Sequence, residues 1–126
     1  MAKRAKLPFD TRGGKIVICR MLLDSNNYQT LSVYSRSLMT LLHVHWRNDK
    51  FVDYGVREAE KRLGCNRKTV MKAFDQLQER GFIVCAEQSL FSSRTQSKSR
   101  SWRLTWLPFN FDSPTNDWEK WKEKIN

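Results

Sequence analysis

Long apolar runs and acidic residues are both scarce in this chain of 126 residues. No apolar run of about 18 residues is present, so no segment is expected to cross a membrane. The first residues, MAKRAKLPFD, lack the apolar stretch of a secretory signal, and a cytoplasmic location is therefore expected. Only 13 acidic residues oppose 23 lysines and arginines, which leaves a formal net charge of +10. Such an excess attracts polyanions, so nucleic acid, an anionic membrane surface and an acidic protein are the candidate partners.

Cysteine and histidine are also rare. The three cysteines, Cys19, Cys65 and Cys85, are odd in number and far apart, and no C-x-x-C pair is present. We therefore expect reduced, mostly buried thiols rather than disulfides or metal ligands. The two histidines, His43 and His45, lie in a helical pattern, where residues two apart face different directions. No metal ion or other cofactor is expected.

Catalytic motifs are missing as well. The sequence contains no glycine-rich phosphate loop, no nucleophile motif and no paired-carboxylate constellation. An enzyme is therefore not expected. Membrane binding is not expected either, because the amphipathic segments have the pattern of helices that face a core rather than an interface.

The chain divides into a basic arm (residues 1–15), a central domain (16–109) and a tail (110–126). Nothing periodic is expected in the arm, because it carries Pro8, Gly13 and Gly14. The arm is predicted to be flexible, and two roles are open: a contact with nucleic acid phosphates, or a solvated terminus. Its basic residues are Lys3, Arg4, Lys6, Arg12 and Lys15.

The tail is predicted to form a short amphipathic helix. Trp118, Trp121 and Ile125 recur at i, i+3 and i+7, and Asn116 is a suitable N-terminal cap. Docking on its own domain is favoured, because an isolated helix this short is marginal in water. The alternative is a homodimer in which Trp118 and Trp121 contact a second protomer, since tryptophan is enriched in interfaces.

The first part of the central domain predicts one firm helix. Residues 16–23 are an apolar run expected to pack on the core, and residues 24–27 have turn chemistry. From Ser32 to Trp46 the apolar positions recur as on one helix face, with His45 as a core or boundary residue. These positions are Tyr34, Leu38, Leu41, Leu42 and His45. Residues 51–54 are expected to form a short strand, which Gly55 ends.

Residues 55–83 predict two helices joined by a three-residue turn. The first is short and amphipathic, and Gly64 ends it. Cys65 lies in the turn, Asn66 caps the second helix, and Gly81 ends it. The apolar positions are Val56, Ala59 and Leu63 in the first helix, and Val70, Ala73, Phe74 and Leu77 in the second.

The outer face of the second helix begins strongly basic. A helix about 12 Å wide fits the major groove of B-DNA. Arg67 can bind guanine with two hydrogen bonds, Asn66 or Gln76 can pair with adenine, and Lys68 and Thr69 can also grip phosphate. The candidate DNA-binding residues of this helix are Asn66, Arg67, Lys68, Thr69, Lys72 and Gln76.

A β-hairpin is predicted after the second helix. Residues 82–86 form an apolar run of strand length, and Trp102, Leu104 and Trp106 alternate with polar residues. The serine-rich segment 87–101 between them has no acidic residue after Glu87. It is expected either to contact the DNA backbone or to be a solvated hairpin tip. Its candidate DNA-binding residues are Arg94, Lys98 and Arg100.

The order of helix, helix, three-residue turn, helix and basic hairpin resembles that of prokaryotic winged helix-turn-helix domains, mainly through EAEKRLGCNRKTVMKAFDQLQERGFI. DSNNYQTLS at 24–32, residues 57–83 and SRSWRLTWLPF at 99–109 are similar to small helix-turn-helix proteins of bacterial genomes and mobile elements.

The resemblance spans about residues 16–109 and implies a mainly α fold with a small β-hairpin. It implies double-stranded DNA binding, in transcriptional regulation or in the replication or transfer of a mobile element. The helix from Arg67 would read the DNA, and the loop near Arg94 would be the wing. Glu60 departs from the pattern, since these motifs favour a small residue where the two helices come close.

Two other functions are consistent with the charge. The first is a protein-interaction module that holds an acidic partner and binds DNA only as a polyanion, with a Kd no better than about 10⁻⁴ to 10⁻⁶ M. The second is RNA binding, for which stacking aromatics on an exposed sheet would be expected. Trp102 and Trp106 fit the core better, so single-stranded RNA is expected to compete poorly.

Overall fold

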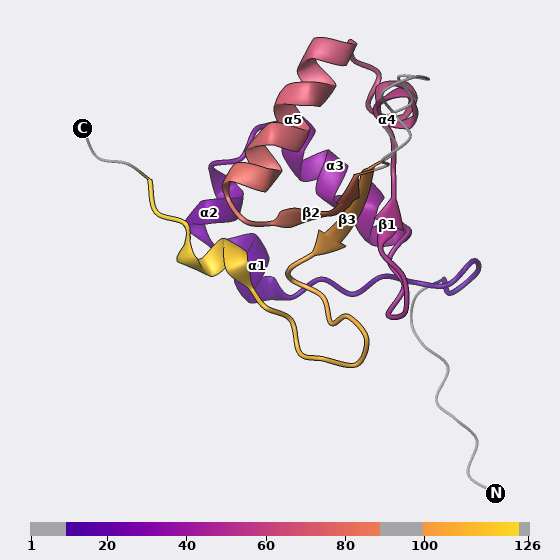
Figure 1. Ribbon diagram of the computed structural model, residues 1–126, viewed down its shortest axis with the longest axis vertical. Coiled ribbons are helices and arrows are strands. Elements are labelled where there is room, and N and C mark those ends of the chain that lie inside the picture. The colour runs from indigo at the N-terminus through magenta and orange to yellow at the C-terminus, as the bar shows by residue number, and fades with distance from the viewer. Residues whose placement is uncertain (1–9, 89–99, 124–126) are drawn as a thin grey trace, which may run out of the picture.

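The computed structural model describes residues 10–88 and 100–123, which form a helical body with a small three-stranded antiparallel sheet (Figure 1). The helices are α1 (Arg20–Asp24), α2 (Asn26–Gln29), α3 (Val33–Val44), α4 (Val56–Leu63) and α5 (Arg67–Glu79). The strands are β1 (Val52–Asp53), β2 (Ile83–Gln88) and β3 (Arg100–Leu104), and a 3-10 helix η1 (Asp117–Lys120) follows. The three helices predicted for the central domain, the short strand and the pairing of the two hairpin strands are thereby confirmed as elements.

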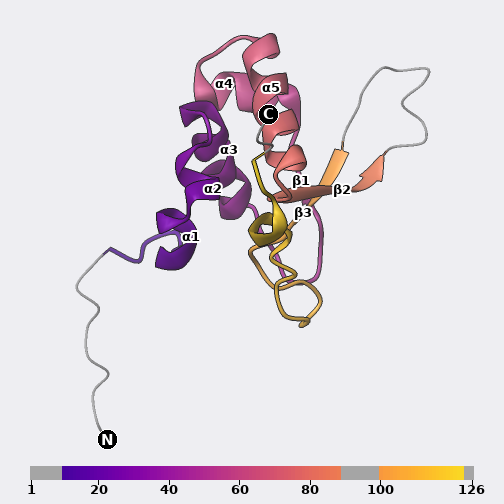
Figure 2. The same cartoon turned by 90° about the vertical axis from the view of Figure 1, so that its left-hand side faces the viewer.

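The sheet has the order β1-β3-β2, so the strand that precedes α4 pairs with the last strand of the chain. Ile83 lies opposite Leu104 and Val52 lies opposite Trp102, with a register shift between Cys85 and Glu87. The β2–β3 hairpin projects from one side of the molecule, and α1 to α3 lie on the other (Figure 2). No helix within residues 10–88 and 100–123 is long and apolar enough to cross a membrane.

The core joins the helices to the sheet mainly through aromatic rings. Phe74 of α5 stacks on Trp102 of β3, with ring centroids 5.3 Å apart. Phe82 stacks on Trp118 of η1 at 5.8 Å. Because Phe82 directly follows the turn after α5, this residue connects the end of α5 both to the sheet and to the tail.

The buried face of α3 differs from the predicted one. Leu38 and Leu42 are buried as expected, but Tyr34 is 40% exposed and His45 is exposed. The prediction of His45 as a core or boundary residue is thus wrong, and the buried face runs instead through Ser35, Leu38, Met39, Leu42 and His43. A periodicity of apolar residues missed Ser35 and His43 because both are polar, although each finds a hydrogen-bond partner inside the domain.

His43 is the buried histidine, and its Nδ1 accepts a hydrogen bond from Nε1 of Trp106 at 3.3 Å. Burial lowers the pKa of His43, because the charged imidazolium would lose its hydration. The two rings also meet edge to face, with centroids 6.0 Å apart. This pair fixes the segment after β3 against α3.

The apolar run 16–23 packs on the core only in part. Ile18, Leu22 and Leu23 lie against the core, whereas Ile16 and Val17 are exposed. The cysteines are free, but the expectation of mostly buried thiols is wrong. Cys19 is exposed at the start of α1, and Cys65 and Cys85 are half-buried.

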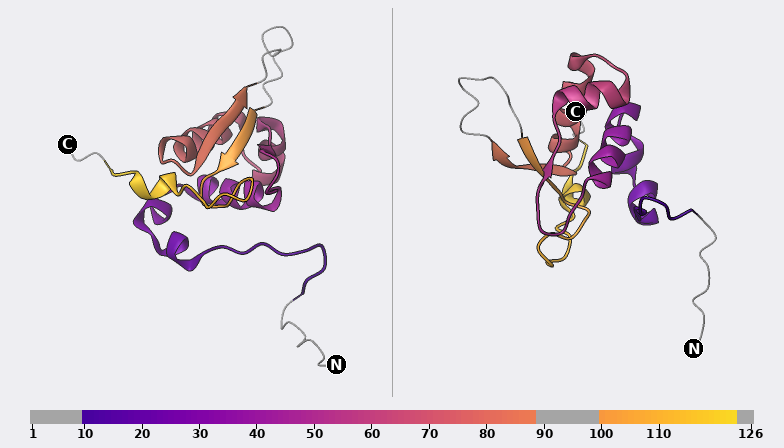
Figure 3. Two further views of the ribbon diagram at one scale, coloured as in Figure 1. Left: turned by 60° about the horizontal axis from the view of Figure 1, so that its bottom comes forward. Right: turned by 90° about the vertical axis from the view of Figure 1, so that its right-hand side faces the viewer.

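The tail docks on its own domain, but not as the predicted amphipathic helix (Figure 3). Its regular part is the four-residue η1, and Trp118 is only 6% exposed. Asn116 is left-handed with a φ of 50° and makes no capping hydrogen bond; its Oδ1 accepts from Nε1 of Trp118 instead. Ile125 lies outside the described residues. A homodimer built on the tail would have to form without Trp118 at its surface.

Hydrogen bonds to residues far away in the sequence hold the tail on the domain. The side-chain amide of Asn27 donates to the carbonyl oxygens of Trp118 and Trp121 at 2.7 and 3.1 Å. Arg80 lies 4.2 Å from the centroid of the Trp121 ring, and it donates to the carbonyl oxygen of Asn27 at 2.9 Å. The end of α5, α2 and the tail therefore form one connected unit.

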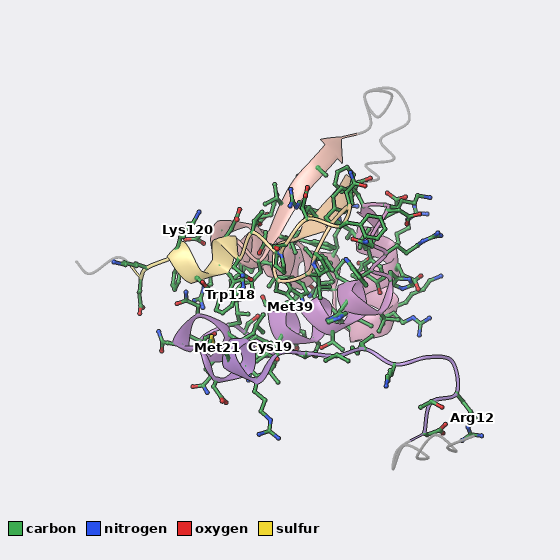
Figure 4. All side chains as sticks on the ribbon, turned by 90° about the horizontal axis from the view of Figure 1, so that it is seen from below. Arg12, Cys19, Met21, Met39, Trp118 and Lys120 are labelled. Carbon is green, nitrogen blue, oxygen red and sulfur yellow. The ribbon has the colours of Figure 1, made fainter. Side chains whose placement is uncertain are left out.

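The basic arm is described only from residue 10, so the predictions for Lys3, Arg4 and Lys6 lie outside the described residues. Arg12 is exposed and pairs with Asp10 at 2.6 Å. Figure 4 shows Arg12 at one end of the molecule, far from Lys120 of η1.

Candidate nucleic-acid interface

The turn between α4 and α5 is built by two capping residues. Gly64 ends α4 in the left-handed region with a φ of 65°, and its N–H donates to the carbonyl oxygen of Glu60. Asn66 begins α5, because its side-chain oxygen accepts from the backbone N–H of Thr69 at 2.9 Å. Both caps and the three-residue turn agree with the sequence pattern. They fix the direction in which α5 leaves α4.

The outward face of α5 carries three of the six DNA-binding residues predicted for this helix. Val70, Ala73, Phe74 and Leu77 are buried, so the opposite face is turned to solvent. Arg67, Lys68 and Lys72 are exposed on it, and none of the three forms an ion pair or hydrogen bond with another described residue. Their charges are therefore free to attract an anion.

Gln76 was predicted to pair with adenine, but its side-chain oxygen is bonded within the domain instead. Its side-chain oxygen accepts from the backbone N–H of Ser32 at 3.0 Å and from Oγ of Ser35 at 2.6 Å. Gln76 thus ties the start of α3 to the middle of α5. The side-chain oxygen of Asn66 is likewise occupied by its capping bond, and Thr69 is half-buried.

Helix α4 adds basic residues that the sequence reasoning did not select. Arg57 and Lys61 are exposed one turn apart on its polar face. Arg62 is exposed too, but Nε of Arg62 lies 3.2 Å from Glu58. Residues 57–72 contain six basic and two acidic residues, so this end of the molecule is strongly positive. The spacing of Arg57 and Lys61 at i and i+4 was the available signal.

Ala59 and Glu60 show how α4 approaches α5. Ala59 is fully buried, whereas Glu60 is half-buried and forms no ion pair with a described residue. The small buried residue of α4 is therefore Ala59, one position before Glu60.

The hairpin tip, residues 89–99, lies outside the described residues. Arg94 and Lys98 lie outside the described residues, and of Arg100 only the backbone, at the start of β3, is described. Trp102 of β3 and Trp106, which follows this strand, offer no stacking surface, because Trp102 is 2% and Trp106 is 9% exposed. Within the described ranges, no group of three or more His, Cys, Asp or Glu side chains could hold a metal ion.

Comparisons of the chain with protein families, with curated proteins and with solved structures found no match.

Proposed function

We propose that this chain is a winged helix-turn-helix protein that binds double-stranded DNA, with α5 in the major groove. The observation that carries the proposal is the exposed face of α5, where Arg67, Lys68 and Lys72 have no acidic partner among the described residues. A regulator of transcription, or a factor for the replication or transfer of a mobile element, would use such a helix in the same way.

The arrangement of the elements supports the fold part of the proposal. Helices α3, α4 and α5 pack together, and α4 and α5 are joined by a three-residue turn. The β2–β3 hairpin follows α5 directly and projects beside it, as a wing would (Figure 2). A strand between α3 and α4 completes the sheet against the hairpin.

The charges support the ligand part of the proposal. The first turn of α5 combines Arg67 and Lys68 with the positive end of the helix dipole, which favours phosphate. Arg57 and Lys61 on α4 extend the same positive surface. A helix before the reading helix commonly crosses the DNA backbone, where lysine and arginine neutralise phosphates.

Single-stranded RNA or DNA is the less suitable ligand. Sequence-tolerant binding of single strands relies on bases that stack on exposed aromatic rings. Trp102 and Trp106, the aromatics of the β3 region, are both in the core. Unstructured RNA should therefore compete weakly with duplex DNA.

A binding titration tests the proposal. Fluorescence anisotropy is measured with the duplex around the chain's own gene and with a scrambled duplex of equal length, each at two salt concentrations. A preference of about 10³-fold or more for the native duplex establishes specific recognition. Equal, steeply salt-dependent binding of both duplexes instead favours the protein-interaction module that treats DNA as a polyanion.

A charge-matched pair of variants locates the surface. The double variant Arg67→Ala with Lys72→Ala is expected to lower duplex affinity at least tenfold, roughly the effect of two lost phosphate or base contacts. The control, Lys120→Ala with Lys122→Ala, removes the same charge from two exposed positions of the tail. Equal losses in the two double variants would contradict a reading face on α5.

A further inference from the structure

The exposed face of α5 contains one acidic residue in its middle, Asp75. Lys68, Lys72 and Asp75 recur at i, i+4 and i+7 on the side opposite the buried residues, so they form one line along the helix. Asp75 forms no ion pair or hydrogen bond with a described residue, not even with Lys72 three positions before it. Its carboxylate is thus exposed and available, like the lysine charges.

A free carboxylate at this place needs an explanation if α5 enters the groove. Asp75 lies eight residues after Arg67, which is about 12 Å along the helix, or about three to four base pairs of DNA. The phosphates on both sides of the groove repel a carboxylate at that depth. Two bases present an amino donor in the major groove, cytosine at N4 and adenine at N6. Beside N6 of adenine lies the acceptor N7, which repels a carboxylate, so cytosine is the base that an aspartate favours.

The neighbouring polar side chains Gln76 and Asn66 already accept hydrogen bonds within the domain, so Asp75 is the free acceptor for a base edge. Gln76, the adjacent polar residue, already accepts two hydrogen bonds from Ser32 and Ser35. Asn66 caps the helix. The free groups along the line are therefore two cationic donors followed by the carboxylate of Asp75, and the carboxylate of Glu79 lies one turn later, at the end of the helix.

We propose that Asp75 reads a cytosine in the DNA site through its N4 amino group, and that Lys68 and Lys72 face guanine or phosphate on the preceding base pairs. This inference rests on the proposed DNA-binding function. It makes Asp75 a determinant of sequence specificity rather than of overall affinity, because its charge disfavours every duplex that lacks the amino group at that position.

The test uses Glu79 as a matched control. Glu79 is exposed one turn after Asp75 and has the same charge, and no described residue pairs with it. The full chain, Asp75→Asn and Glu79→Gln are each used to select duplexes from a random library. The affinity for the selected site and for its single-base variants is then measured. Both substitutions remove one negative charge, so any uniform gain in affinity is common to the two.

The wild-type chain is expected to select a site with one cytosine whose replacement weakens binding about tenfold. Asp75→Asn should abolish that preference and shift it toward adenine, which asparagine binds through N6 and N7. Glu79→Gln should keep the cytosine preference. Unchanged base preferences in Asp75→Asn would overturn the role of Asp75 while leaving DNA binding intact. If the wild-type chain selects no duplex, and Arg67→Ala does not change the affinity for duplex DNA, then both the proposed function and this inference fail.

Discussion

The two ends of this molecule use their polar side chains in opposite ways. At the end formed by α4 and the start of α5, the lysines and arginines other than Arg62 extend into solvent without partners among the described residues. At the end formed by η1 and the segment after β3, polar groups form hydrogen bonds with residues far away in the sequence. Thr105, for example, is buried, and its Oγ1 donates to the carbonyl oxygen of Gly81 at 2.7 Å. The difference teaches that one end is available for a ligand and the other holds the fold together.

The largest effect on stability is expected at the tail end, from Trp118→Ala. This substitution removes a buried ring that stacks on Phe82, and the loss of a large core aromatic costs about 3–5 kcal/mol. The free energy of unfolding from urea titration measures it. By contrast, Arg67→Ala with Lys72→Ala should change stability by no more than about 0.5 kcal/mol, because both side chains are exposed. If the two changes destabilised the fold equally, the contrast between the ends would be false.

Two left-handed glycines sharpen the comparison. Gly81 has a φ of 80°, and a Cβ there would lie 2.9 Å from the backbone oxygen of Asp117. Gly64 has a φ of 65°, but a Cβ there would meet nothing within 4 Å. We expect Gly64→Ala to cost about 1 kcal/mol from conformation alone, and Gly81→Ala to cost about 3 kcal/mol, because the tail must also shift.

Urea titration of both glycine variants gives the two free energies. Similar costs would show that the tail yields easily at Asp117. A larger cost for Gly81→Ala would confirm that the end of α5 and η1 are closely fitted.

The buried His43 should make the stability depend on pH. Burial lowers the pKa of folded His43 below its ordinary value of 6.5, and protonation would also break the hydrogen bond from Trp106. As the pH falls through 6.5, the unfolded chain binds a proton that the folded chain does not, so stability is lost. The contribution of neutral His43 to the free energy of unfolding is complete well above pH 6.5. It decreases as the pH falls, until the pH reaches the lowered pKa of the folded state.

Unfolding midpoints between about pH 7.5 and about pH 5.5 test this dependence, since histidine titrates in that range. His43→Gln should flatten the curve. His45→Gln is the control, because His45 is exposed, and it should keep the slope. A slope that persists in His43→Gln would assign the titration to another group.

The smallest effect is expected at the turn after β3, and it is a gain. Asn110 and Phe111 both have positive φ, 54° and 67°, and Phe111 is 88% exposed. Glycine is favoured at the second position of such a turn, and a phenylalanine there is strained. Phe111→Gly should therefore raise the free energy of unfolding by about 0.5–1 kcal/mol, after the entropy cost of glycine. Phe111→Ala keeps the strain and should change it less.

The boundaries of α4 and α5 follow closely from local sequence. Gly64, Asn66 and the apolar spacing in residues 56–77 are local signals, since caps and periodicity depend on neighbours within one or two helical turns. The exposed positions of Arg67, Lys68 and Lys72 follow from the same spacing. These parts could be predicted because no distant residue was needed to place them.

The sequence by itself thus determined the helix boundaries around the turn, the hairpin and the positive charge. Only the tertiary structure decided that α3 buries Ser35 and His43, that Gln76 bonds to the start of α3, and that the tail contains a 3-10 helix. For the buried polar side chains of α3 and for Gln76, the physical reason is the same. A polar side chain can be buried when a partner satisfies it, and here those partners lie 41 to 63 positions away in the chain, beyond the reach of any local pattern.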